Sequence, residues 1–173
     1  MGYTTDFNGY VTLDKPLNKD QIVYLKQFNR TRHMRLKPEV ETNYPCPARQ
    51  ALGLPFGEDG EFQVRDQGEY SWNEAVDYNT PPGECPSLWC DWTVSDDGTR
   101  IEWDDAEKFY EYVDWMDYLI RKFIKPWGYV ANGDIEWFGE DHNDFGLLIV
   151  KDNIVSVRVG QRTLGRQRRI SEK

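Results

Sequence analysis

Apolar and polar residues along this chain follow two different periods, which predict strands and helices in alternation. Residues 7–13 alternate with a period of two, which is typical of a strand with one buried face. Further strands are expected over residues 88–94, 99–103, 134–137, 145–150 and 154–159. Asp97-Gly98 and the short connection 151–153 are typical of hairpin turns, so the strands that flank them should pair antiparallel.

The first helix is predicted by its capping residues. Gln21 follows Asn18 at the spacing of a capping box, and apolar residues continue at helical spacing to about Arg32. The pattern then fails over residues 34–86, which hold seven of the nine prolines. Because a long structureless loop is uncommon within a domain, we expect an insertion of short turns that lies across the domain, with a brief strand at 62–64.

A second helix is predicted over residues 104–125. Asp104 and Glu107 repeat the capping-box spacing, and Pro126 ends the helix. Acidic residues come early in this segment and basic residues come late, as the helix dipole favours. Five apolar side chains share one narrow stripe and predict the buried face: Phe109, Val113, Met116, Ile120 and Phe123.

The order of elements is therefore β-α-insertion-β-β-α-β-β-β, which predicts an α+β fold. We expect an antiparallel-rich sheet with two helices packed on one face. The topology that fits best is a ferredoxin-like split β-α-β core, interrupted by the long proline-rich insertion and extended by a C-terminal β-hairpin. Residues 1–160 should form a single domain, and the basic residues 161–173, which lack an apolar period, are expected to form a mobile tail.

The chain is acidic, and its charge is distributed unevenly. The 173 residues carry a formal net charge of −9, although the last thirteen hold five Lys or Arg against one Glu. An acidic body argues against binding of duplex nucleic acid, because affinity for phosphates comes from clustered Lys and Arg. The acidic residues either keep the protein soluble or form a surface for a partner with a basic surface.

Several features point to a soluble protein of the cytoplasm. No apolar run approaches the about 20 residues that span a bilayer, so no membrane association is expected. The first residues lack the basic and apolar regions of a signal peptide. Three cysteines are an odd number, which argues against a disulfide framework and favours a reducing compartment.

The second predicted helix offers a candidate surface for a protein partner. Trp115 and Tyr118 fall away from the buried stripe, on a side that they share with acidic residues. Two rings on a nominally exposed face need a cover, which is either the insertion or another molecule. The predicted partner-binding residues are Glu107, Glu111, Asp114, Trp115 and Tyr118.

A basic cluster at the end of the first helix suggests a different ligand. Arginines there precede an aromatic-rich insertion, and such a combination can hold a phosphate and stack a base. This arrangement suits a small nucleotide better than a duplex, although arginine clusters also serve protein partners. The candidate ligand-binding residues are Arg30, Arg32, Arg35, Tyr78 and Trp89.

Two further groups of residues are weaker candidates for metal ligands. Asp134, Glu136, Glu140 and His142 lie in one acidic segment, which is also explained by a solvated hairpin connection. Cys85 and Cys90, with His33 or His142, have loose zinc-ligand spacing but no second cysteine pair. The sequence contains no P-loop, dinucleotide-binding, zinc-protease or nucleophile-elbow motif, so no catalytic residue and no cofactor is predicted.

Three stretches of the sequence together resemble a known family. They are Gly2-Tyr3-Thr4-Thr5-Asp6-Phe7, residues 103–118 with Glu107-Lys108-Phe109-Tyr110, and Lys125-Pro126-Trp127-Gly128-Tyr129 running into Asn132-Gly133. They resemble a family of small, acidic, uncharacterised proteins of bacteria and their bacteriophages. The resemblance covers most of the chain outside the insertion. It implies a cytoplasmic protein and adds a role in phage–host conflict to the hypotheses, but it implies no activity and no catalytic residue.

The sequence alone therefore favours a binding protein over an enzyme. The first hypothesis is a non-enzymatic protein whose acidic, aromatic-bearing surface meets a protein partner, for example as a phage-type inhibitor of a host defence protein. The second is a protein that binds or sequesters a small nucleotide. The third is a metal-dependent hydrolase that uses the acidic segment 134–144.

Overall fold

The computed structural model describes residues 2–66 and 68–160, and it has the mixed α+β architecture expected from the sequence. Strands predominate at both ends of the described chain, whereas short helices predominate in the insertion. The elements are β1 (Thr5–Leu13), α1 (Lys19–Arg30), β2 (Arg35–Leu36), α2 (Glu39–Asn43), α3 (Pro47–Ala51), β3 (Ala75–Asp77), β4 (Trp92–Val94), β5 (Arg100–Trp103), α4 (Tyr112–Leu119), β6 (Ala131–Gly139), β7 (Phe145–Lys151) and β8 (Ile154–Val159).

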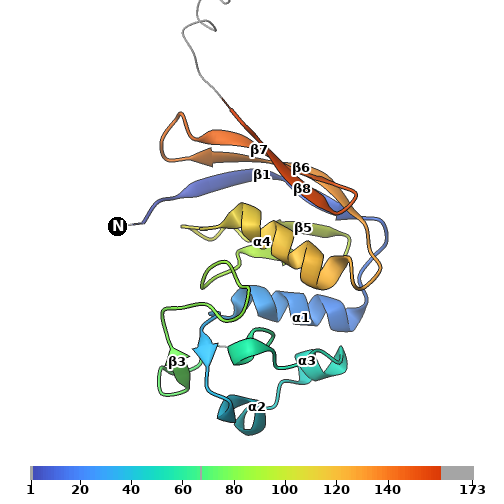
Figure 1. Cartoon of the computed structure of the whole chain (residues 1–173). Helices are drawn as coiled ribbons and strands as arrows, with labels where there is room; N and C mark the ends of the chain where they lie inside the picture. The colour runs from blue at the N-terminus through green and yellow to red at the C-terminus, as the bar shows by residue number, and fades with distance from the viewer. Residues whose placement is uncertain (1, 67, 161–173) are drawn as a thin grey trace, which may run out of the picture.

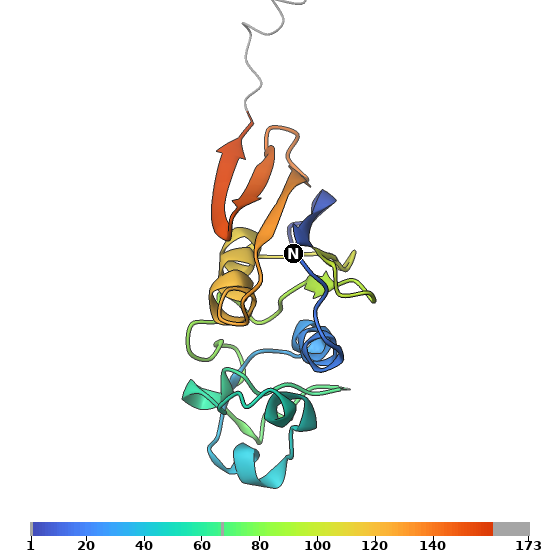
Figure 2. The same ribbon diagram turned by 90° about the vertical axis from the view of Figure 1, so that its right-hand side faces the viewer.

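Six of the strands form one antiparallel sheet in the order β4-β5-β1-β6-β7-β8. The chain passes from β1 to β4 through α1 and the insertion, and from β5 to β6 through α4. Both helices lie on the same side of this sheet, and the insertion lies beyond α1 (Figure 1). The view from the side shows this layering of sheet, helices and insertion (Figure 2). The opposite face of the sheet is covered by no helix among the described residues.

Alternation along the strands explains which side of the sheet is buried. In β1, Val11 and Leu13 are buried whereas Tyr10 and Thr12 are exposed, and in β6, Ile135 is buried between exposed neighbours. The buried side chains join those of α1 and α4 in one main core, rich in aromatic residues. A smaller core belongs to the insertion and its entry: Met34, Leu36, Val40, Tyr70 and Ala75.

Local signals in the sequence correctly predicted α1 and the last hairpin. The Asn18 side chain accepts the N–H of Gln21, and the Gln21 side chain accepts the N–H of Asn18, each at 2.9 Å. Between β7 and β8, Asp152 and Asn153 both adopt positive φ angles, of 49° and 70°. Such a pair turns the chain in the sense that matches the twist of an antiparallel hairpin.

The second predicted helix begins eight residues later than expected. Asp104 accepts the N–H of Ala106 at 2.9 Å and therefore forms a local turn instead of capping a helix. Three residues that follow, Asp105, Lys108 and Glu111, have left-handed φ angles of 68°, 62° and 57°. A right-handed helix cannot pass through these residues, so α4 begins only at Tyr112 and continues through a π-helical turn at Ile120–Ile124.

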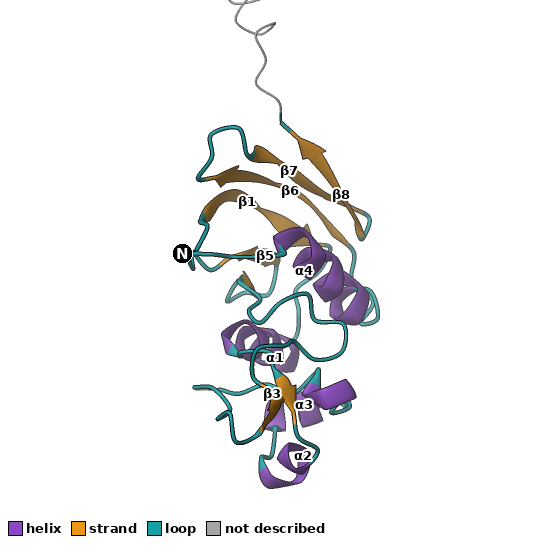
Figure 3. Ribbon diagram, turned by 60° about the vertical axis from the view of Figure 1, so that its left-hand side comes forward, coloured by secondary structure: helices purple, strands orange, loops and turns teal. Residues whose placement is uncertain are grey.

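The insertion packs across α1 and against α4, as Figure 3 shows. Its centre is not the strand predicted at 62–64. The Phe62 carbonyl accepts the hydroxyl of Tyr24 at 2.8 Å, and the buried Gln63 amide donates to Tyr44 O and to Tyr70 Oη. Polar groups of this segment are thus satisfied by tertiary hydrogen bonds, and the pairing that a strand would need is not formed.

Candidate functional site

A cavity of about 850 Å³ opens beside the C-terminal end of α1. Three segments that are far apart in the sequence form its walls: the end of α1, the returning part of the insertion, and the irregular segment between β5 and α4. Its volume falls within the usual range for small-molecule sites. The lining residues are Asn29, Arg30, Arg32, Asn79, Pro81, Ser87, Leu88, Trp89, Asp91, Asp104, Ala106, Glu107, Lys108 and Tyr110.

Two aspartates lie side by side in the cavity wall because of the β4–β5 hairpin. Trp92 pairs with Trp103 in that hairpin, and the residues just outside this pair, Asp91 and Asp104, are joined through the Asp104 N–H and the Asp91 carbonyl at 3.0 Å. Burial, and then the charge of Asp104, raise the pKa of Asp91 to about 7. Burial also raises the pKa of Asp104. The pair therefore holds a proton near neutral pH more readily than ordinary carboxylates do.

Asn29 of α1 fixes the position of this pair. Its side-chain nitrogen donates to Asp104 Oδ2 at 2.8 Å and to the carbonyl oxygens of Cys90 at 2.9 Å and Trp92 at 3.3 Å. The other carboxylate oxygen of Asp104 accepts the Ala106 N–H. Asp104 is thus held on both sides, which leaves Asp91 as the carboxyl with freedom to contact a ligand.

Basic and aromatic side chains occupy other parts of the wall. Arg32 donates to the Tyr78 carbonyl at 3.3 Å and to Asn79 Oδ1 at 3.2 Å, and its guanidinium lies 4.0 Å from the centre of the Tyr78 ring. Arg30 is largely exposed and lies 3.8 Å from Asp66. Trp89 is partly buried, and Tyr110 is 47% exposed. The cavity therefore combines cations and ring faces with a buried acid.

The residues predicted to bind a small nucleotide are only partly brought together. Arg30, Arg32 and Trp89 line the cavity. Tyr78 stacks behind Arg32 outside the lining, and Arg35 points elsewhere, where its Nε donates to Asp59 Oδ2 at 2.9 Å. Arg35 lies in β2, beyond the end of α1, so its side chain follows the insertion and not the helix.

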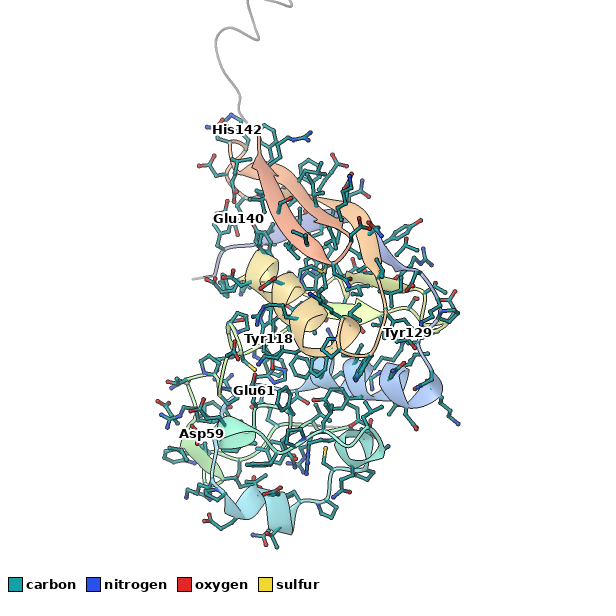
Figure 4. All side chains as sticks on the ribbon, turned by 45° about the vertical axis from the view of Figure 1, so that its right-hand side comes forward. Asp59, Glu61, Tyr118, Tyr129, Glu140 and His142 are labelled. Atoms are coloured by element: carbon teal, nitrogen blue, oxygen red, sulfur yellow. The ribbon has the colours of Figure 1, made fainter. Side chains whose placement is uncertain are left out.

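The predicted partner surface on α4 loses both of its aromatic rings. Trp115 and Tyr118 are each 0% exposed, so the prediction that they contact another molecule is wrong for this structure. The insertion and the residue that follows it cover these rings. Tyr118 donates to Glu61 Oε2 at 2.8 Å, as Figure 4 indicates, and Trp115 Nε1 donates to Ser87 Oγ at 2.7 Å. The acidic residues predicted with them, Glu107, Glu111 and Asp114, remain exposed.

The acidic residues named as weak candidates for metal ligands do not converge on one point. Asp134 and Glu136 point outward from β6, whereas Glu140 and His142 lie in the turn that follows, at the far end of the hairpin in Figure 4. Glu136 accepts the side-chain N–H of Asn8, and Glu140 accepts the N–H of Thr4. Within residues 2–66 and 68–160, no three acidic, histidine or cysteine side chains are grouped as metal ligands.

The cysteines and His33, which sequence spacing suggested as zinc ligands, are buried side chains. Cys85 and Cys90 are buried free thiols, and Cys85 contacts the Tyr118 hydroxyl at 3.7 Å. His33 is buried, and its Nε2 lies 2.8 Å from the Phe28 carbonyl. Burial lowers the pKa of His33 to about 4, so its ring is neutral and belongs to the core.

Asp91 and Asp104 are the site residues that sequence reasoning missed. A weak signal for them exists in the predicted hairpin, because Asp104 directly follows the strand 99–103 and Asp91, inside the predicted strand 88–94, directly precedes Trp92-Thr93-Val94. In an antiparallel pair, such flanking residues come to lie opposite each other. The signal is weak, since aspartates at strand ends also serve as ordinary turn residues.

Comparisons with known proteins do not indicate what the cavity binds. No protein-family model matches the sequence, no curated protein is similar to it, and no solved structure matches the fold. In the part of the chain that the structure describes, no helix combines the length and the apolar character needed to cross a bilayer.

Proposed function

We propose that this protein binds a small nucleotide in the cavity at the end of α1. The observation that carries the proposal is that four residues of complementary chemistry line one cavity. They are Arg30 and Arg32, Trp89 with its ring, and Asp91 with its buried carboxyl. Guanidinium groups bind phosphate through charge-assisted hydrogen bonds, and an indole ring provides a stacking surface for a base. A buried polar group at a distance from the cations would fix the orientation of the base.

A binding role fits this geometry better than catalysis. General acid–base work would suit the raised pKa of Asp91, but the described lining contains no Ser, Cys or His beside it that forms a nucleophile–base pair. Ser87 instead accepts the indole N–H of Trp115 and contacts the carbonyl oxygens of Trp89 and Tyr110. The cavity is therefore proposed to hold its ligand without converting it.

Calorimetric titration with nucleoside monophosphates tests the proposal. We expect measurable binding for the intact protein and a loss of about tenfold in affinity for Arg30→Ala, because one phosphate contact is removed. Arg158→Ala provides a matched control, since Arg158 is an exposed arginine of β8 outside the cavity lining. If no nucleoside mono-, di- or cyclic phosphate produces heat, the proposed function is wrong.

A protein partner is the second candidate function, on a surface other than the one first predicted. The uncovered face of the sheet carries the exposed rings of Tyr10 and Phe138 beside the exposed acids Asp134 and Glu136. Such a combination suits a partner with a basic surface, including the host protein that a phage-type inhibitor would block. The intact protein should capture such a partner in a pull-down. The Asp134→Lys, Glu136→Lys double variant should fail to capture it, whereas the hairpin variant Lys151→Glu should still capture it.

We further propose a finer fold class and a cellular compartment for this protein. The antiparallel order β4-β5-β1-β6, with α1 and α4 in the two crossovers, supports a ferredoxin-like split β-α-β core that β7 and β8 extend. The three cysteines are buried free thiols, which supports a reducing compartment such as the cytoplasm.

A further inference from the structure

Asp91 is a largely buried acid of the cavity wall whose side chain has no hydrogen-bond donor among the described residues. Its residue is 7% exposed and lines the cavity, yet among the described residues no group donates a hydrogen bond to its carboxyl. Its oxygen atoms are not sealed inside the protein, because they are not among the buried polar atoms without a partner. A desolvated carboxyl that faces a cavity and lacks a donor is a site to which a ligand can supply one.

The groups around Asp91 restrict what the ligand must bring. The side-chain nitrogen of Asn29 is already shared among Asp104 and two carbonyl oxygens, so it has no free N–H for a ligand. Both carboxylate oxygens of Asp104 are occupied, by Asn29 and by the N–H of Ala106. The acceptor that this part of the wall leaves free is therefore the Asp91 carboxyl. The matching edge of a ligand must offer hydrogen-bond donors.

We infer that the Asp91 carboxylate selects a guanine base by accepting its N1–H and its exocyclic 2-amino group. This inference rests on the proposed function and names the base that the cavity takes. Guanine presents two adjacent donors on its Watson–Crick edge, which match the two oxygens of an ionised carboxylate. Adenine and cytosine present one donor beside an acceptor, and uracil presents one donor between two acceptors, so each leaves one carboxylate oxygen facing an acceptor.

Titration of the intact protein with different bases tests the inference first. At pH 8, GMP should bind best, and inosine monophosphate, which lacks the 2-amino group, should bind about tenfold more weakly. AMP and CMP should be weaker still, because their ring nitrogen would face a carboxylate oxygen. Equal affinities for GMP, inosine monophosphate and AMP would overturn the choice of guanine while leaving nucleotide binding in place.

A change of one atom in Asp91 tests the same contact from the protein side. Asp91→Asn keeps the shape of the side chain but offers one acceptor and one donor. Xanthine keeps the N1–H of guanine and carries a carbonyl in place of the 2-amino group, so it matches the amide. We expect the variant to lose at least about tenfold in affinity for GMP and to gain a similar factor for xanthosine monophosphate.

These experiments distinguish a failure of guanine selection by Asp91 from a failure of nucleotide binding in the cavity. If the folded variant loses GMP binding without gaining xanthosine monophosphate, Asp91 does not contact the base edge and the inference fails. If the variant does not fold, the ranking of bases by the intact protein decides alone. If the intact protein binds no nucleotide at all, the proposed function itself fails, and the selection of guanine fails with it.

Discussion

Asp91 has a fixed position in the fold, but the ionised form of its carboxyl is disfavoured there. It flanks a buried strand, lies next to Asp104, and its pKa is raised to about 7 by burial and by that neighbour. Other charged groups that face the cavity are Asp104, Glu107, Arg30, Arg32 and Lys108. An acid so placed favours the folded state most when it is protonated, because ionisation in the fold costs more than ionisation in water.

The free energy of unfolding should therefore fall with rising pH through the titration of Asp91. The folded pKa lies above the ordinary value of 3.8, so the stabilising effect is complete below about pH 4 and is lost as pH rises to 7. Relative to Asp91→Asn, the intact protein should lose about 2 kcal/mol between pH 5 and pH 7 and little more above it. Denaturant unfolding at several pH values measures this difference, and parallel curves for the two proteins would contradict it.

Trp115 shows at the same scale why helical position alone did not predict exposure. Its indole is fully buried and donates to Ser87, which directly follows the insertion and lies 28 positions away in sequence. Helix geometry correctly places it away from the sheet, but only tertiary structure shows that the insertion occupies that side. The sequence could indicate that a cover was needed and could not identify it.

Replacing Trp115 should consequently destabilise the fold strongly. Trp115→Ala is expected to lower the free energy of unfolding by about 3–5 kcal/mol, because it leaves a cavity and removes a hydrogen bond. Trp72→Ala is the matched control: Trp72 is 75% exposed, so its removal should change stability by about 0.5 kcal/mol or less. Equal effects of the two substitutions in a denaturant titration would show that Trp115 is not buried as described.

At the scale of elements, sequence patterns located most strands and one helix and misplaced the start of the other. β8 has the predicted limits, and α1 has its predicted capping box, because both depend on contacts between near neighbours. At 104–111 two local arrangements compete. The capping-box pattern at Asp104 is present, but the indole N–H of Trp103 donates to the Ala106 carbonyl, and the segment turns back to line the cavity.

The left-handed residues of this segment can be tested at Lys108, whose φ angle is 62°. A side chain at positive φ costs about 1 kcal/mol relative to glycine, which has no Cβ to clash. Lys108→Gly should therefore be more stable than Lys108→Ala by about 1 kcal/mol, although both remove the same amine. A more stable alanine variant, measured by thermal unfolding, would contradict the left-handed conformation.

At the scale of the whole molecule, the cavity exists only because three distant segments meet. The end of α1, the return of the insertion and residues 104–110 each contribute to its lining. Arg30, Arg32 and Trp89 were recognisable as candidates from residue type, but nothing in the sequence indicated that Asp91 and Asp104 face them. Residue chemistry is therefore predictable here, whereas the meeting of the three walls depends on how the insertion packs.

A ligand that joins three walls should stabilise the entire fold. At a concentration of GMP about 100 times its dissociation constant, the free energy of unfolding should rise by about 2.7 kcal/mol, because only the folded state binds. At the same concentration of GMP, Arg30→Ala should gain less, in proportion to its weaker affinity. A GMP-dependent stabilisation that is equal for the two proteins would place the nucleotide outside this cavity.

The most direct test is a crystal structure of the protein soaked with GMP. We predict density for the base in the cavity, with its N1–H and 2-amino groups within hydrogen-bond distance of the Asp91 carboxylate and the phosphate beside Arg30 and Arg32. A cavity that stays empty in crystals that bind GMP elsewhere, or a nucleotide whose base faces away from Asp91, would contradict the account.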